Sequence, residues 1–193
     1  MKLPRFNGKK PSKYWLSIDG TRETHDNIRG AKVFDNVLEN IREHHPVVTS
    51  AIMTLNYKEI EKIAKIAYDN GASGLIFQFY TGYPDDPLLL KGDMLREATK
   101  KILKVMHEYE NFFCYSRKML EVYLTKEFVP YCIFKTGQIK SFYPDGTQKF
   151  CVMGNSPLLC ENCGCVVPIV AYTLFRKFDA GTVDKARKIF NLG

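Results

Sequence analysis

The stretch VVTSAIMTLNYKEIEKIAKIAYDNGASGLIFQF, residues 47–79, decides the fold of this chain. Its first seven residues, VVTSAIM, are mostly apolar and lack clean alternation, as is typical of a strand that is buried on both faces. Asn56, with Glu59 three residues later, has the pattern of a capping box, so a helix is expected to follow. Gly71 is placed to end that helix, and residues 73–79 form a further strand. The order strand, helix, strand with short connections predicts a right-handed parallel βαβ unit.

The flanking sequence extends this alternation in both directions. Residues 13–18 (KYWLSI) are aromatic and aliphatic and end at a turn, which predicts another strand. Apolar side chains recur at helical spacing in residues 31–43, 91–109 and 117–125, so three amphipathic helices are expected. Three parallel strands make a thin sheet, and such sheets are normally extended on both sides. We therefore expect that the upstream neighbour of the first strand is missing from this chain.

The character of the sequence changes near residue 128. Residues 138–143 and 147–153 predict the two strands of a β-hairpin, with a Pro-Asp-Gly turn between them. Cysteines surround this hairpin, and a short helix is expected at the C-terminus. We therefore expect an α/β part over residues 1–128 and a small cysteine-bearing β-hairpin module with a C-terminal helix over residues 129–193.

Composition limits the class of protein. With 193 residues, 45% of them apolar, the chain is long enough to bury a core. It has no apolar run of membrane-spanning length and no signal-peptide pattern, so we expect a cytoplasmic protein without membrane partners. In that compartment cysteines favour metal ligation over disulfides, although intracellular hyperthermophile proteins are an exception. The net charge of +7 is spread over helix faces that also carry glutamate, so a nucleic-acid partner is not expected.

Four of the six cysteines lie between Cys151 and Cys165, in the pattern C-x8-C-x2-C-x-C. Cys160 and Cys163 have the spacing of a two-ligand turn, and the predicted hairpin would bring Cys132 close to Cys151. Thiolates grouped in this way bind soft metals or iron–sulfur clusters. Three interpretations stay open: an iron–sulfur cluster, a tetrahedral zinc site, and buried free thiols that pack like small hydrophobic groups.

A second group of polar residues follows the first predicted strand. Ser17 and Asp19 are alternate residues at its carboxyl end, where ligands of open α/β sheets bind, and Arg29 could clamp a carboxylate with two hydrogen bonds. In a purely structural interpretation, Asp19 and Gly20 form a turn, Asp26 caps a helix and Arg29 is a surface cation. Spacing alone favours the structural interpretation.

The segments WLSIDG, residues 15–20, and HDNIRG, residues 25–30, resemble the fourth-strand region of radical S-adenosylmethionine (SAM) enzymes, in the branch that contains peptide-modifying maturases. The resemblance continues through the next strand and helix, as far as residue 82. It implies that residues 1–128 form the C-terminal portion of a partial (β/α)6 barrel with parallel strands.

In that family the residues matching Ser17 and Asp19 contact SAM, the arginine matching Arg29 binds its methionine carboxylate, and the asparagine matching Asn56 faces the cofactor. The family's C-x3-C-x2-C motif, whose cluster cleaves SAM reductively, is missing from this chain, and so is its G-G-E segment. The resemblance therefore implies SAM binding without independent activity. A separate polypeptide that supplies the N-terminal half-barrel, a split gene, or a decayed fragment without activity would each account for the gap.

The cysteine region has a resemblance of its own. The region is similar to the SPASM/twitch-like auxiliary module of radical SAM maturases. That module has a cysteine, a hairpin with an Asp-Gly turn, a second cysteine and a later C-x2-C, and the cysteines in these places are here Cys132, Cys151, Cys160 and Cys163. This resemblance implies a 4Fe–4S cluster, with Cys165 as a further ligand or a spare thiol. The two resemblances imply a radical SAM-type protein that binds SAM and an iron–sulfur cluster and acts on an unknown substrate. The alternative is a non-enzymatic, zinc-stabilised binding module whose positive charge would contact nucleic acid.

Overall fold

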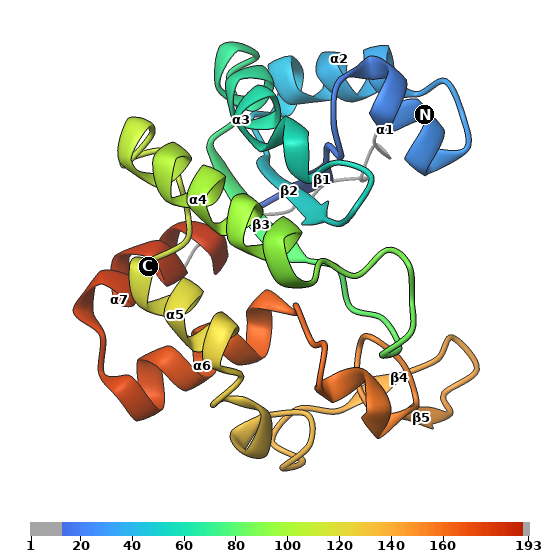
Figure 1. Ribbon diagram of the computed structural model, residues 1–193, viewed down its shortest axis with the longest axis vertical. Coiled ribbons are helices and arrows are strands. Elements are labelled where there is room, and N and C mark those ends of the chain that lie inside the picture. The colour runs from blue at the N-terminus through green and yellow to red at the C-terminus, as the bar shows by residue number, and fades with distance from the viewer. Residues whose placement is uncertain (1–12, 191–193) are drawn as a thin grey trace, which may run out of the picture.

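The computed structural model describes residues 13–190, in which three short parallel strands lie between two groups of helices (Figure 1). No helix within these residues is long and apolar enough to cross a membrane. The elements in chain order are β1 (Trp15–Ser17), α1 (Arg22–Arg29), α2 (Phe34–His44), β2 (Val47–Ile52), α3 (Ile60–Asp69), β3 (Gly74–Phe79), α4 (Gly92–Glu108), α5 (Arg117–Thr125), β4 (Ser141–Phe142), β5 (Gln148–Lys149), α6 (Val166–Lys177) and α7 (Ala180–Phe190).

The main sheet has the strand order β1–β2–β3, and all three strands are parallel. Trp15 lies opposite Val47, and Val47 lies opposite Gly74. The three predicted strands are therefore confirmed, and so is the α/β character of the fold. One further parallel bridge joins Leu75 to Phe113, so the chain after α4 continues the sheet beyond β3. Each connection between strands passes through a helix, as parallel pairing requires.

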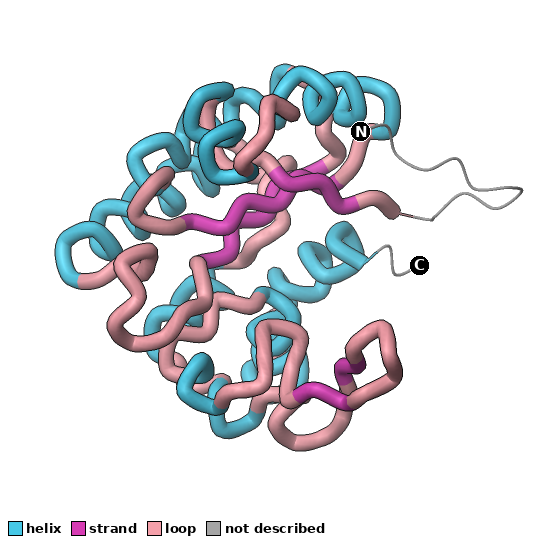
Figure 2. Tube along the Cα trace, turned by 90° about the vertical axis from the view of Figure 1, so that its right-hand side faces the viewer, coloured by secondary structure: helices cyan, strands magenta, loops and turns pink. Residues whose placement is uncertain are grey.

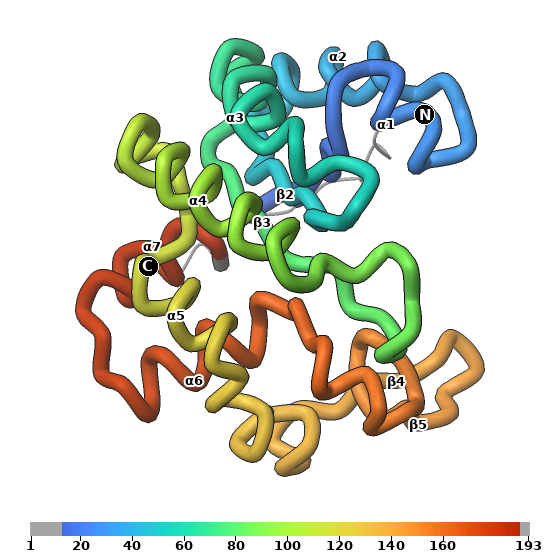
Figure 3. The backbone as a smooth tube through the Cα atoms, in the orientation of Figure 1, coloured from blue at the N-terminus to red at the C-terminus, as the bar shows by residue number. Residues whose placement is uncertain are grey.

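Helices lie on both sides of this sheet. α1, α2 and α3 lie on one side, and α7 lies on the other, below the strands in the view of Figure 2. Trp15 Nε1 in β1 donates a hydrogen bond to the carbonyl oxygen of Ile189 in α7 (3.2 Å), which joins the last helix to the first strand. Figure 3 shows the chain leaving α5, passing through the cysteine-bearing loops and returning through α6 to α7 beside the sheet.

One buried core joins the sheet to helices from both ends of the chain. Ile18 and Phe77 from the sheet region, Met119 from α5, Val166 from α6 and Ile189 from α7 all belong to the same cluster of buried side chains. Removing such apolar area from water is the main favourable term in folding. The core therefore extends across the boundary predicted near residue 128, and α6 and α7 pack as parts of the α/β core.

The N-terminal helices differ from the sequence prediction. α1 lies where no helix was predicted, and α2 begins later than the helix predicted over residues 31–43. A carboxylate explains the later start, because Asp26 Oδ1 in α1 accepts hydrogen bonds from the N–H groups of Val33 and Phe34, both at 2.9 Å. These donors at the start of α2 have no partners within the helix. Asp26 therefore caps a helix, but it does so from a neighbouring helix.

The capping box predicted at Asn56 and Glu59 is wrong. A 3₁₀ turn, Tyr57–Glu59, precedes α3, and Asn56 makes no side-chain cap there. Glu59 instead accepts hydrogen bonds from the Thr21 N–H (2.6 Å) and the Thr24 hydroxyl (3.0 Å) at the start of α1. Both Asn56 and Glu59, which the local pattern assigned to the start of the helix, therefore form hydrogen bonds with residues that are distant in the sequence.

The hairpin is shorter than predicted. β4 and β5 pair over two residues each, in place of the predicted strands 138–143 and 147–153. The predicted turn is present, with the Thr147 N–H donating to Asp145 Oδ1 (2.9 Å) and with Gly146 at a φ of 84°. Most side chains of this segment are exposed, so no core packs against longer strands, and an isolated two-stranded hairpin is only marginally stable.

Candidate cysteine site and sheet-edge site

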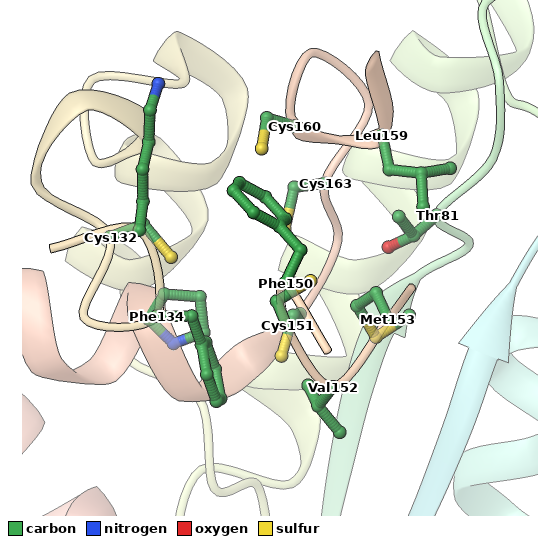
Figure 4. A pocket seen from close by; sticks show the side chains of 13 residues that line it. Thr81, Cys132, Phe134, Phe150, Cys151, Val152, Met153, Leu159, Cys160 and Cys163 are labelled. Atoms are coloured by element: carbon green, nitrogen blue, oxygen red, sulfur yellow. The ribbon is translucent and has the colours of Figure 1, made fainter. Parts of the chain in front are cut away.

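The five cysteines predicted as metal ligands line one small cavity (Figure 4). They are Cys132, Cys151, Cys160, Cys163 and Cys165. Apolar side chains form much of the remaining wall, and in Figure 4 the ring of Phe150 lies among the labelled thiols. The five cysteines that the sequence grouped therefore lie around one cavity, whose wall is mostly sulfur and hydrocarbon, with Thr81 and Lys135 as polar members.

Two of these cysteines lie in short hydrogen-bonded turns of the exposed loop region. The carbonyl oxygen of Cys132 accepts a hydrogen bond from the Thr136 N–H (2.9 Å). Cys151 exchanges backbone hydrogen bonds with Gly154, at 3.0 and 3.2 Å. The segment has little regular secondary structure, so these turns are what fixes the backbone at each cysteine.

The other three cysteines lie at the entry to α6. Cys160 ends the 3₁₀ turn Pro157–Cys160, and its carbonyl oxygen accepts a hydrogen bond from the Cys163 N–H (3.2 Å). Cys165 is the N-cap residue of α6 and is buried. Because α6 belongs to the main core, these three cysteines are anchored to the rigid part of the molecule.

The cysteine loop is attached to the carboxyl end of β3. The Gly164 N–H donates to Thr81 Oγ1 (2.9 Å), and Asn162 Nδ2 donates to the Gly82 carbonyl oxygen (3.4 Å). Gly164 approaches so closely that an added Cβ would lie 1.8 Å from the carbonyl oxygen of Phe79. Thr81 also lines the cavity. The cysteine cavity therefore opens beside the sheet edge at which open α/β sheets bind ligands.

Burial raises the pKa of Cys163 to about 11 and the pKa of Cys165 to about 12. Negative charge on neighbouring thiols is a smaller cause of the same rise in pKa: Cys132 and Cys160 act on Cys163, while Cys163, Cys132 and Cys151 act on Cys165. The two buried thiols are therefore protonated at neutral pH, and the cysteines are close enough for their charges to interact. A cation that replaced the protons would offset both effects.

The thiols surround a shared space and do not converge on one point. Within residues 13–190, no three His, Cys, Asp or Glu side chains lie close enough together to hold a single metal ion. Zinc requires four ligand atoms, with sulfur about 2.3 Å from the metal, so the cysteine side chains would have to close in on it. A cluster with several iron atoms is held by thiolates spread around a larger core. Ligand atoms that are all sulfur suit either a zinc ion or an iron–sulfur cluster.

Asp19 and Arg29 meet at the carboxyl end of β1. Asp19 is 2% exposed, and its Oδ2 lies 2.5 Å from Nη2 of Arg29, whose side chain is 41% exposed. The Asp19 N–H donates to His25 Nδ1 (3.1 Å), and burial lowers the pKa of His25, so a neutral ring carries its proton on Nε2. The Ser17 hydroxyl lies nearby in β1, with its Oγ 3.5 Å from Thr49 Oγ1 in β2. The buried Asp19 carboxylate thus holds the partly exposed side chain of Arg29.

Asn56 lies between the carboxyl ends of β1 and β2. It is 1% exposed, and its Oδ1 accepts a hydrogen bond from the Met53 N–H (2.8 Å). Its Nδ2 donates to the carbonyl oxygens of Asp19 and Ala51, both at 2.9 Å. Backbone groups therefore use the whole amide, and Asn56 fastens the end of β1 to the end of β2.

Sequence reasoning missed two residues beside the cysteine cavity, Thr81 and Lys126. A hydroxyl directly after a buried strand could have indicated Thr81, because strand ends in such sheets carry functional side chains. Lys126 Nζ donates to the Cys163 carbonyl oxygen (2.8 Å), and burial lowers its pKa to about 8, so it is still mostly charged at neutral pH. No pattern singles it out, since lysine is common near helix C-termini.

No protein-family model and no curated protein matches this chain. Any assignment of function therefore depends on the residues themselves, on their placement and on the resemblance of their motifs.

Proposed function

We propose that the chain is a cytoplasmic radical SAM-type protein that binds an iron–sulfur cluster in the cysteine cavity and SAM at the sheet edge. One observation carries the proposal: five thiols line one cavity that is attached to the carboxyl end of β3. Asp19 and Arg29 lie at the carboxyl end of β1, which is the same edge of the sheet. The three parallel strands are compatible with the C-terminal portion of a partial (β/α)6 barrel.

The spread of the thiols supports a cluster over zinc. A cluster core reaches donors around a cavity, whereas a single ion would need them to converge. When bound, a cluster supplies redox chemistry or an iron that holds substrate, and the protein supplies binding and orientation. Cys132, Cys151, Cys160 and Cys163 are the proposed ligands, and Cys165 is the fifth thiol of the cavity.

The sheet-edge residues are assigned separate roles. Arg29 binds the methionine carboxylate of SAM, because its side chain is the partly exposed member of the pair with buried Asp19. Buried Asp19 fixes the orientation of Arg29, and the Ser17 hydroxyl offers a further hydrogen bond to the ligand. Asn56 acts through the backbone, since it fastens together the strand ends that carry the other three residues.

A separate polypeptide is proposed as the partner. Within residues 13–190, β1 is the outermost strand of the sheet and pairs only with β2. A half-barrel that carries the missing C-x3-C-x2-C motif would extend the sheet along β1. Reductive cleavage of SAM would then belong to the assembled pair, and its substrate is unknown.

Anaerobic reconstitution with iron and sulfide tests the cluster. The wild type is expected to turn brown, with broad visible absorption and about four iron atoms per chain. A Cys160→Ser, Cys163→Ser double variant is expected to retain little iron, because it lacks two adjacent ligands. Cys114→Ala is the matched control, since this buried thiol lies outside the cavity, and it should load like the wild type.

Two other results of the reconstitution would contradict the cluster. A colourless protein that holds one zinc ion per chain would establish the zinc-stabilised module in its place. A protein that retains neither metal would leave the cysteines as packed free thiols.

Calorimetry with SAM tests the sheet edge. Arg29→Ala is expected to weaken SAM binding at least ~30-fold, because loss of a charge-paired hydrogen bond to a carboxylate costs about 2 kcal/mol or more. Arg22→Ala is the control, since Arg22 lies on the same helix and pairs with exposed Asp35. Equal SAM affinity in the Arg29 variant and the wild type, or no binding by the wild type, would remove the SAM assignment from this chain.

A further inference from the structure

Lys126 places a positive charge against the backbone of Cys163, one of the cysteines that line the cavity. It follows the last residue of α5, and its Nζ donates to the carbonyl oxygen of Cys163 (2.8 Å). The same ammonium lies 3.6 Å from the centroid of the Tyr123 ring. The charge therefore lies between an aromatic face and the backbone of a proposed ligand.

This ammonium has no carboxylate counterpart among residues 13–190. The adjacent acidic residue, Glu127, is occupied by Lys177, with 2.6 Å between Nζ and Oε2. A carbonyl oxygen and an aromatic ring compensate only part of the hydration that a partly buried ammonium loses. The backbone of Lys126 also has a φ of 56°, a conformation that favours glycine at the end of a helix. The ammonium of Lys126 is therefore unfavourable in this place unless negative charge lies nearby.

The thiolate site would provide that negative charge. Four thiolates carry more negative charge than a zinc ion or a 4Fe–4S core offsets, so the loaded site is anionic inside a largely apolar wall. We propose that Lys126 is the counter-charge of the cysteine site, a positioning residue that raises its metal affinity and the reduction potential of its cluster. This inference rests on the proposed function, because it requires the five thiols to bind a metal.

Zinc affinity, measured by competition with a chromophoric chelator, separates charge from structure. Lys126→Gln retains a donor for the Cys163 carbonyl but loses the charge, and it is expected to bind zinc about 10–100-fold more weakly than the wild type. Lys126→Arg retains the charge and should stay within about threefold of the wild type. Lys118→Gln is the matched control: Lys118 lies in α5, the helix that Lys126 follows, is paired with exposed Glu121 and does not line the cavity, so little change in zinc affinity is expected.

Two further measurements exclude a merely structural role for Lys126. Lys126→Met should leave the metal-free protein as stable as the wild type or more stable, because it removes a partly buried charge. After reconstitution with iron and sulfide, the Gln and Met variants should show a more negative reduction potential, and the Arg variant should not.

The inference fails if the Gln and Met variants bind zinc as tightly as the wild type. It also fails if they are destabilised only in the metal-free state. In both cases the proposed function would stand, because the wild type still binds metal. If the wild type binds neither zinc nor a cluster, the inference and the metal assignment fail together.

Discussion

Replacing Asn56 with alanine is expected to lower the free energy of unfolding by about 3–5 kcal/mol. The side chain is buried and satisfies three backbone groups at once: the Met53 N–H and the carbonyl oxygens of Asp19 and Ala51. Each buried polar group left without a partner costs about 1–3 kcal/mol, and the small void adds to that cost. Urea unfolding of the wild type and the variant measures the difference directly.

A second asparagine provides the control for this result. Asn70 Nδ2 makes a single hydrogen bond, to the Ile66 carbonyl oxygen (2.8 Å), at the partly exposed end of α3. Asn70→Ala should therefore cost about 1 kcal/mol or less. Similar losses for the two alanine variants would show that Asn56 is not the junction between β1 and β2.

Local patterns predicted those elements whose stabilising contacts are themselves local. The helix over 117–125 was predicted with its observed bounds, because an apolar stripe faces the core and the Ser116 hydroxyl caps its first turn. α1 was not predicted, since among its residues only His25 is buried and it shows no apolar stripe. Its start is stabilised by Glu59, far along the chain, which sequence spacing does not reveal.

The cysteine site shows the same division between local and tertiary information. The grouping of five thiols could be predicted, because turns and a short hairpin bring together residues that are close in sequence. The placement of the cavity beside β3 could not, because it depends on contacts such as that of Gly164 with Thr81, which are distant in the chain. Lys126 could not be predicted either, since its role depends on where the Cys163 carbonyl lies.

Gly164→Ala is expected to separate the cysteine loop from the sheet. A Cβ at this position would lie 1.8 Å from the carbonyl oxygen of Phe79 and 2.5 Å from its carbonyl carbon, both of which are backbone atoms of a buried strand. Such atoms cannot move aside as a side chain could, so the loop has to shift and its hydrogen bond to Thr81 is lost. Overpacking usually costs about 1–3 kcal/mol, and the absence of any flexible neighbour places this substitution at about 3 kcal/mol or above.

Thermal unfolding and the rate of thiol labelling would measure the two consequences of Gly164→Ala together. The melting temperature should fall, and the buried thiol of Cys165 should react faster, because the loop that covers it has moved. Gly181→Ala serves as the control: a Cβ there meets nothing closer than 3.5 Å, and alanine is favoured over glycine within a helix by roughly 0.5–1 kcal/mol. Unchanged melting and labelling in the Gly164 variant would mean that the cysteine loop is not fixed against β3. The cavity would then have no set position beside the sheet edge, and cluster and SAM could not be placed at a common site.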